Sequence, residues 1–166
     1  PIKDVPLLRR VIQATLATTS RVRFHIAGDG PDAHLIRETA DRYPEHVMFY
    51  GWQHDLAPVM ARCHVLLQTS KNEGTPVALI QGMAAGRPFV STAVGGIVDM
   101  VSGVASDVTS SARWYANGIL VGSDPAAFVS ALFAFQDEPD RLAAMSGAAR
   151  KIAAECYSAD RLIADI

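Results

Sequence analysis

The sequence of 166 residues has few cysteines, no cluster of lysine and arginine, and no apolar run near the ~20 residues that a membrane-spanning helix needs. Its formal net charge of −2 argues against a nucleic-acid-binding protein, because such affinity depends on neutralising several phosphates. No charged segment followed by an apolar one opens the sequence, as it would in a signal peptide. Cys63 and Cys156 lack CxxC spacing and lie in amphipathic segments, so we expect buried free thiols rather than a disulfide or a metal pair. Together these features predict a soluble, cytoplasmic protein.

Several catalytic motifs are also absent. The sequence has no Gly-x-Ser-x-Gly elbow, no His-Glu-x-x-His and no Gly-Lys-Ser/Thr, which are the central residues of serine hydrolases, zinc proteases and P-loop enzymes. Its histidines are scattered, and no two are spaced to place metal ligands one helical turn apart: His25, His34, His46, His54 and His64. We therefore expect no metal site.

The residues that are present fit one globular domain with a substantial core, since 49% are hydrophobic and 19% are charged. Short apolar segments that resemble buried strands alternate with helical patterns at residues 22–27, 47–50, 64–68, 88–92 and 118–121. Residues 4–18 form an amphipathic helical pattern, and residues from 125 onward are helical. This alternation predicts an α/β fold, a doubly wound, Rossmann-like parallel sheet with helices on both faces.

Residues 73–88, with the sequence EGTPVALIQGMAAGRP, predict a loop followed by a buried helix. Thr75 is a good N-cap, Pro76 suits the first helical position, and Gly86 precedes a proline that ends the helix. The helix is apolar on every side except at Gln81, so we expect it to be covered all round. Gln81 then either reaches a polar group or a ligand, or lies on a single solvated stripe.

The amino end of this helix is a candidate ligand site. Gln81 lies roughly 7–8 Å along the axis from Pro76, at ~1.5 Å per residue, so one elongated ligand could contact both Glu73 and Gln81. The free N–H groups of the first turn, from Thr75 to Val77, would suit a phosphate. Gly74 has no Cβ and would let the ligand approach the backbone.

This stretch resembles the donor-binding signature of the retaining GT-B glycosyltransferases of family 4 (group 1), Glu-Gly-x-Pro followed by Glu-x-Met-Ala-x-Gly-x-Pro. Glu73 matches the first glutamate of the signature, and Gln81 stands in place of the second, eight positions later. In such enzymes the first carboxylate lies beside the transferred sugar, and the second accepts hydrogen bonds from the nucleotide ribose. The resemblance implies these roles for Glu73 and Gln81, although the Gln81 carboxamide keeps only one carbonyl acceptor and has no charge.

Two further positions resemble the family. Lys3 stands just before the first helix, where family members carry a lysine that reaches the donor diphosphate; the alternative is a solvated terminal lysine. Residues 49–52 resemble the segment after the family's third strand, which borders the nucleobase. Trp52 in this segment could either stack on a base or cover the sheet.

Two glycine-containing turns are less specific. The turn containing Gly28 and Gly30 resembles the family's second strand-to-helix loop, which lines the donor cleft. It also fits the dinucleotide fingerprint G-x-G-x-x-A of an NAD-dependent oxidoreductase, but the next strand lacks the acidic residue that this reading requires. Gly95 and Gly96 could admit a phosphate or a sugar, or only make a tight turn.

The resemblance covers nearly all of the chain but only one of the two halves of a GT-B enzyme. It implies that residues 1–166 form a single donor-binding domain for a UDP-, GDP- or ADP-linked sugar, with no other cofactor. The acceptor-binding half would lie upstream, and so would the family's first strand, unless residues 1–3 are its end. The acceptor would be a sugar, a lipid or a small molecule, transfer would retain the anomeric configuration, and any peripheral membrane contact would be made through the absent half. This half alone would be inactive.

The alternative is a non-catalytic nucleotide-binding module or partner subunit, in which Gln81 marks decayed chemistry.

Overall fold

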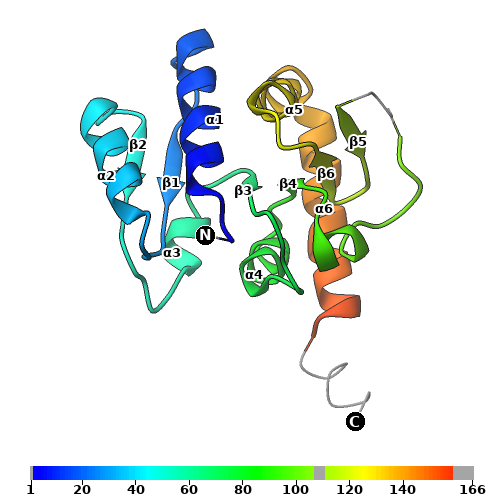
Figure 1. Cartoon of the computed structure of the whole chain (residues 1–166). Helices are drawn as coiled ribbons and strands as arrows, with labels where there is room; N and C mark the ends of the chain where they lie inside the picture. The colour runs from blue at the N-terminus through cyan, green and yellow to red at the C-terminus, as the bar shows by residue number, and fades with distance from the viewer. Residues whose placement is uncertain (1, 107–110, 159–166) are drawn as a thin grey trace.

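A computed structural model describes residues 2–106 and 111–158 of the chain (Figure 1). Helices and strands alternate through most of it, as the sequence predicts. In chain order the elements are α1 Val5–Thr18, β1 Phe24–Ile26, α2 Ala33–Arg42, β2 Val47–Phe49, α3 Ala57–Met60, β3 Leu66–Gln68, α4 Val77–Ala84, β4 Phe89–Thr92, the 3₁₀ helix η1 Gly95–Asp99, β5 Ala112–Trp114, β6 Gly118–Val121, α5 Pro125–Asp137 and α6 Pro139–Cys156. None of the described helices is long and apolar enough to cross a membrane.

The five predicted strands are all present and parallel, but they form two sheets instead of one. β1 pairs with β2, and β3, β4 and β6 form the second sheet, in which Val90 lies opposite Leu67 on one side and Ile119 on the other. Among the described residues, no strand pairing connects β1 to β3. Figure 1 accordingly shows β1, β2, α1 and α2 on the left, and the second sheet with α4, α5 and α6 toward the right.

One strand was not predicted. β5 pairs antiparallel with β6 at the edge of the second sheet, and Ser106 forms an isolated bridge to Trp114. The sequence predicts no element at residues 112–114, because Ala-Arg-Trp is too short a segment to show an alternating pattern.

Helices cover both faces of the second sheet, which confirms the doubly wound arrangement. α1 and α5 pack on one face, where Leu7 and Phe128 belong to the same buried cluster as Val90. α4 and α6 pack on the other face, where Met83 and Ala149 join Phe89. α4 can approach β3 closely because residue 82 is glycine, and a Cβ there would overlap the Leu66 side chain.

α4 differs from its prediction in two respects. It begins at Val77 with Pro76 as N-cap, so the prediction that Thr75 caps the helix is wrong, and no side chain caps it. It is also not covered all round: Leu79, Gly82 and Met83 are buried, whereas Val77, Ala78, Gln81 and Ala84 are exposed. The apolar composition misled the prediction, because alanine and valine are tolerated at exposed positions. The predicted end is correct, since Gly86 has a φ of 73° and its N–H bonds to the Met83 carbonyl.

The start of the chain is held against the carboxyl end of β3. The Lys71 N–H donates to the Ile2 carbonyl at 2.8 Å, and the Thr69 hydroxyl donates to the Lys3 carbonyl at 3.1 Å. Asp4 then caps α1 by accepting from the Leu7 N–H. Residues 2 and 3 form a turn and belong to no strand, and their position places the Lys3 side chain beside the loop that joins β3 to α4.

Candidate functional site

The loop between β3 and α4 carries Glu73, whose carboxylate is the centre of a hydrogen-bond cluster. Its Oε1 accepts from Lys3 Nζ at 2.6 Å, from Ser70 Oγ at 2.6 Å and from Gln68 Nε2 at 2.8 Å. The structure therefore brings together Glu73 and Lys3, two residues that the sequence analysis singled out separately. Sequence reasoning missed Gln68 and Ser70, although both are polar residues at the carboxyl end of a predicted buried strand, where α/β folds place ligand-binding groups.

The cluster keeps Glu73 ionised. Burial alone would raise the pKa of the Glu73 carboxyl, but the hydrogen bonds from Lys3, Ser70 and Gln68 and the charge of Lys3 outweigh it and hold the pKa below the usual value for glutamate. The Glu73 side chain is only 12% exposed, whereas that of Lys3 is 62% exposed. The site thus holds a nearly buried carboxylate whose cationic partner reaches into solvent.

The turn at Gly95 and Gly96 fixes the backbone of this loop. The Gly96 N–H donates to the Glu73 carbonyl at 3.0 Å. Gly95 has a φ of 49°, and a Cβ there would overlap the Glu73 carbonyl oxygen; a Cβ on Gly96 would lie 2.6 Å from the Gly74 carbonyl oxygen. Glycine is needed at both positions because the start of η1 packs directly against the backbone of residues 73 and 74. The sequence analysis considered a ligand site or a tight turn here, and did not predict this packing.

The amino end of α4 is open. Gly74 and Thr75 are exposed, and a Cβ on Gly74 would meet no atom within 4 Å. The N–H groups of Val77 and Ala78 have no hydrogen-bond partner among the described residues. Unpaired N–H groups at a helix start bind anions well, so the predicted phosphate site has the exposed backbone that it requires.

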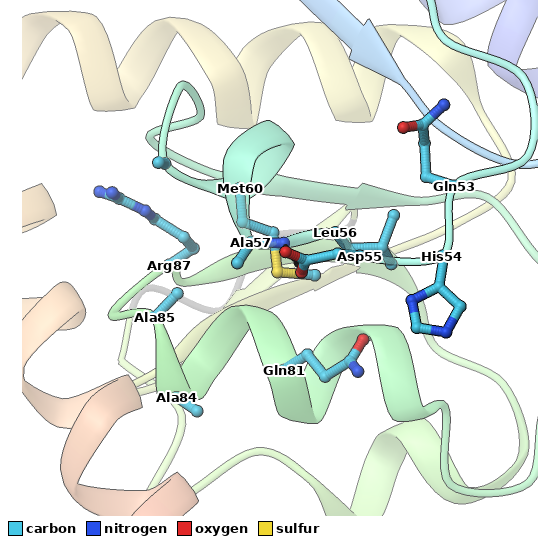
Figure 2. A pocket seen from close by; sticks show the side chains of 11 residues that line it. Gln53, His54, Asp55, Leu56, Ala57, Met60, Gln81, Ala84, Ala85 and Arg87 are labelled. Carbon is cyan, nitrogen blue, oxygen red and sulfur yellow. Dashed lines mark hydrogen bonds between the residues drawn. The ribbon is translucent and has the colours of Figure 1, made fainter.

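Gln81 faces a cavity of about 460 Å³ between α4 and the segment leading into α3. Figure 2 shows its carboxamide extending from α4 toward His54 and Asp55, with Arg87 at the opposite end of the cavity. Gln81 is exposed, and its carboxamide has no hydrogen-bond partner among the described residues. It therefore lies on a solvated face, and that face lines a cavity large enough for a small molecule.

A second cavity, of about 130 Å³, lies between β1, β3 and α4 and is lined in part by His25 and Gln68. His25 Nδ1 lies 2.7 Å from the Tyr50 hydroxyl, and the two rings are stacked. Burial, with the nearby charges of Arg62 and Arg23, lowers the pKa of His25. These contacts hold His25 against Tyr50, the residue that follows β2.

Gly28, Gly30 and Trp52 lie at the carboxyl ends of β1 and β2. The Gly28 N–H donates to the Gly51 carbonyl at 2.7 Å, which ties the two loops together. Gly28 and Gly30 have φ values of 135° and 151°, and a Cβ on either would point into open space. Trp52 is 69% exposed, so the alternative that it covers the sheet is wrong, and its indole makes an edge contact with the His54 ring. Of the predicted site residues, Gln81 alone lines either of the two cavities.

The described residues contain no group of three or more histidine, cysteine, aspartate or glutamate side chains placed to hold a metal ion. Both cysteines are free. Cys63 is half-buried, and burial raises the pKa of its thiol. Cys156 is exposed, so the prediction that it is buried is wrong; it ends α6, where the helix leaves the core.

Comparison with known proteins places this chain in a family. The family described as "Glycosyl transferases group 1" matches residues 1–137. The gpi3 subunit of phosphatidylinositol N-acetylglucosaminyltransferase from Schizosaccharomyces pombe is 33% identical over 103 residues, covering 60% of this chain and 23% of that protein. N-acetyl-alpha-D-glucosaminyl L-malate synthase from Bacillus anthracis is 28% identical over 103 residues, covering 60% of this chain and 27% of the synthase. The alignments thus span about a quarter of the length of these relatives.

Solved structures share the fold. The crystal structure of TarM, a protein of S. aureus, aligns with a TM-score of 0.82 at 20% identity, covering 99% of this chain and 32% of TarM. HepE of Anabaena, crystallised with UDP, aligns with a TM-score of 0.78 at 20% identity, covering 99% of this chain and 45% of HepE. Both comparisons identify the fold as the Rossmann-like domain of a GT-B glycosyltransferase. The family match over residues 1–137 shows that the chain belongs to the group 1 glycosyl transferases.

Proposed function

We propose that this chain is the donor-binding half of a retaining glycosyltransferase, which binds a nucleoside-diphosphate sugar and positions it for transfer. The observation that carries the proposal is the Glu73–Lys3 pair, at 2.6 Å, beside the open amino end of α4. Support comes from structures with the same fold, since HepE has been crystallised with UDP and with UDP-glucose. UDP is therefore the first donor nucleotide to test, followed by GDP and ADP.

Each site residue has a role in this proposal. The diphosphate lies against the N–H groups of Val77 and Ala78 and is neutralised by the Lys3 ammonium, which stabilises the leaving group as the glycosidic bond breaks. Gly74 lets the sugar approach the loop, where Glu73 binds a sugar hydroxyl close to the reacting carbon. Gln81 accepts a hydrogen bond from the ribose within the larger cavity. No separate cofactor is needed for these roles.

The residues on the other sheet complete the proposed donor site. The exposed Trp52 indole offers an apolar face on which a nucleobase can stack. Gly28 and Gly30 would approach the donor from this sheet, because the turn that contains them follows the carboxyl end of a parallel strand. Thr75 and Pro76 shape the loop that presents the helix end.

The acceptor site lies, in this proposal, in a second domain outside the 166 residues. The chain aligns with only 21–27% of the length of its curated relatives, so most of their length has no counterpart here. The acceptor would be a sugar, a lipid or a small molecule, and contact with a membrane surface would be made through that domain. Two relatives are named as subunits of a larger enzyme, which makes partner subunits part of the proposal. We place the protein in the cytoplasm, where its free cysteines would stay reduced.

A second candidate is a non-catalytic partner subunit that binds the nucleotide without transferring sugar. The observation that favours it is Gln81, which cannot supply the negative charge of the glutamate in the family signature. The two candidates share the binding step and differ in turnover.

Calorimetric titration of the full-length protein with UDP, GDP, ADP and their sugars tests the shared step. We expect binding of one nucleotide, with weaker binding after Lys3→Ala. Absence of binding by every nucleotide would refute both candidates. Where binding occurs, release of the nucleoside diphosphate from the sugar donor, measured with a panel of acceptors, separates a transferase from a binding subunit.

A further inference from the structure

The Glu73 carboxylate is held by one oxygen only. Oε1 accepts all three hydrogen bonds of the cluster, from Lys3, Ser70 and Gln68. Within residues 2–106 and 111–158, no donor lies within hydrogen-bond distance of Oε2. One edge of the carboxylate is thus fixed, and the other is free to accept from a ligand.

We propose that Gln68 and Ser70 are positioning residues that hold Glu73 in place when the Lys3 ammonium moves from the carboxylate to the donor diphosphate. This inference rests on the function proposed above, and it adds two residues that no family signature or sequence pattern identified. Of the three donors to Glu73, Lys3 would exchange the carboxylate for the diphosphate, whereas Gln68 and Ser70 would stay bonded to the carboxylate.

Lys3 is suited to exchange. Its side chain is 62% exposed, and Glu73 is its only ion-pair partner among the described residues. Its backbone is held by the Thr69 hydroxyl, so the ammonium can swing while the main chain stays in place. A diphosphate carries more negative charge than one carboxylate, and a lysine ammonium is a mobile point charge, so the diphosphate competes well for it.

Gln68 and Ser70 are suited to remain. Gln68 is the last residue of β3, and Ser70 is 1% exposed. The Thr92 hydroxyl donates to the Ser70 carbonyl at 2.6 Å, which fixes this residue to the neighbouring strand. Gln68 Nε2 also lies 3.2 Å from Ser70 Oγ, so the two donors support each other. Both are neutral, and therefore a diphosphate attracts them less than it attracts the ammonium.

Without these two donors, Glu73 would lose every hydrogen bond on departure of Lys3. A carboxylate that is only 12% exposed cannot obtain full hydration in compensation, so it would rotate or take up a proton. The sugar would then lose its contact with Oε2 in the step where Glu73 is needed. Nucleotide binding would be preserved, because the helix end and Lys3 do not depend on these donors.

The test compares Ser70→Ala and Gln68→Met in the full-length enzyme, with Ser91→Ala as the matched control. Ser91 is a fully buried serine on β4 whose hydroxyl donates to the Thr92 carbonyl, so its replacement also removes one buried hydrogen bond but none of those that Glu73 accepts. We expect Ser70→Ala and Gln68→Met to lower kcat by about tenfold or more, as for loss of a hydrogen bond to a charged group, with UDP affinity within about twofold of wild type. Ser70→Thr, which keeps the hydroxyl, should restore most of the lost kcat.

Two outcomes would overturn the inference while leaving the proposed function intact. The first is a kcat within twofold of wild type for both variants, and the second is a loss of UDP affinity as large as the loss of kcat. If Ser70→Ala does not fold, Gln68→Met and Ser70→Thr decide the question in the same assays. A wild-type protein that binds no nucleotide would instead refute the proposed function itself. A UDP-bound structure should show Lys3 Nζ on the phosphates with Glu73 still bonded to Gln68 and Ser70; a Glu73 that has left both would contradict the inference.

Discussion

Replacing Gly95 with alanine should deform the Glu73 loop and destabilise the domain. Two effects add at this position. Gly95 has a φ of 49°, where an alanine costs about 1–2 kcal/mol. The new Cβ would also overlap the Glu73 carbonyl oxygen, which is backbone and cannot rotate away, and overpacking of this kind costs about 1–3 kcal/mol.

The expected loss is therefore about 3 kcal/mol in the free energy of unfolding, or about 6–12 °C in Tm for a domain of this size. Differential scanning calorimetry of the purified protein measures it. Gly147→Ala is the matched control, because Gly147 lies exposed within α6 and a Cβ there meets no atom within 4 Å. Alanine is a better helix former than glycine, so this control should be neutral or raise Tm.

A Gly95→Ala protein that melts within about 2 °C of wild type would refute the packing argument. It would mean that η1 can move away from the loop at little cost, and the hydrogen bond from Gly96 to Glu73 would then have no structural importance. Loss of Tm without loss of UDP affinity would show that the loop matters for stability but that the helix end binds independently of it.

Three further predictions concern the site. The pKa of Glu73 is lowered in the folded protein, so its ionised form contributes stability that is complete above the ordinary glutamate pKa, near ~4.5, and is lost as the pH falls through the lowered value. Between pH 7 and pH 3 the Tm should therefore fall less steeply for Glu73→Gln than for wild type, and equal slopes would contradict this. Lys3→Ala should weaken UDP binding by about tenfold in calorimetry and flatten its salt dependence, because one cation near the diphosphate is lost; unchanged affinity at low salt would remove Lys3 from the site. Gln81→Glu should raise turnover at least about tenfold if the chemistry has decayed, whereas little change would identify glutamine as a working ribose ligand.

The sequence predicted those parts of the fold that local pattern determines. Residues 64–68 and 88–92 are apolar segments bounded by polar or glycine-containing stretches, and both contain the strands predicted there. β5 was missed because Ala112–Trp114 becomes a strand only through its pairing with β6. The exposed face of α4 was missed for a related reason, since alanine at positions 78 and 84 gives no indication of which side meets the core.

The candidate site shows the same limit. Glu73 and Gln81 were found because they occupy the two glutamate positions of a signature, and Lys3 because it stands where the family carries a lysine. The structure brings Glu73 and Lys3 into contact although they lie 70 positions apart. Gln68 and Ser70 belong to no signature, and their role depends on how the chain turns after β3. A polar residue at the carboxyl end of a buried strand is a signal that could have suggested them.

The division of the sheet bears on how a donor would bind. Lys3, Glu73 and the start of α4 are built on the sheet that contains β3, whereas Gly28, Gly30 and Trp52 follow strands of the other sheet. Among the described residues no ladder joins the two sheets, and they are connected through α1 and the side chains packed beneath it, including Ile12 and Leu67. A nucleotide that stacks on Trp52 while its phosphates contact α4 would therefore bridge both sheets. Binding would then stabilise the junction as well as the site, so UDP should protect the amides of β1 and β3 from hydrogen exchange more than those of α6.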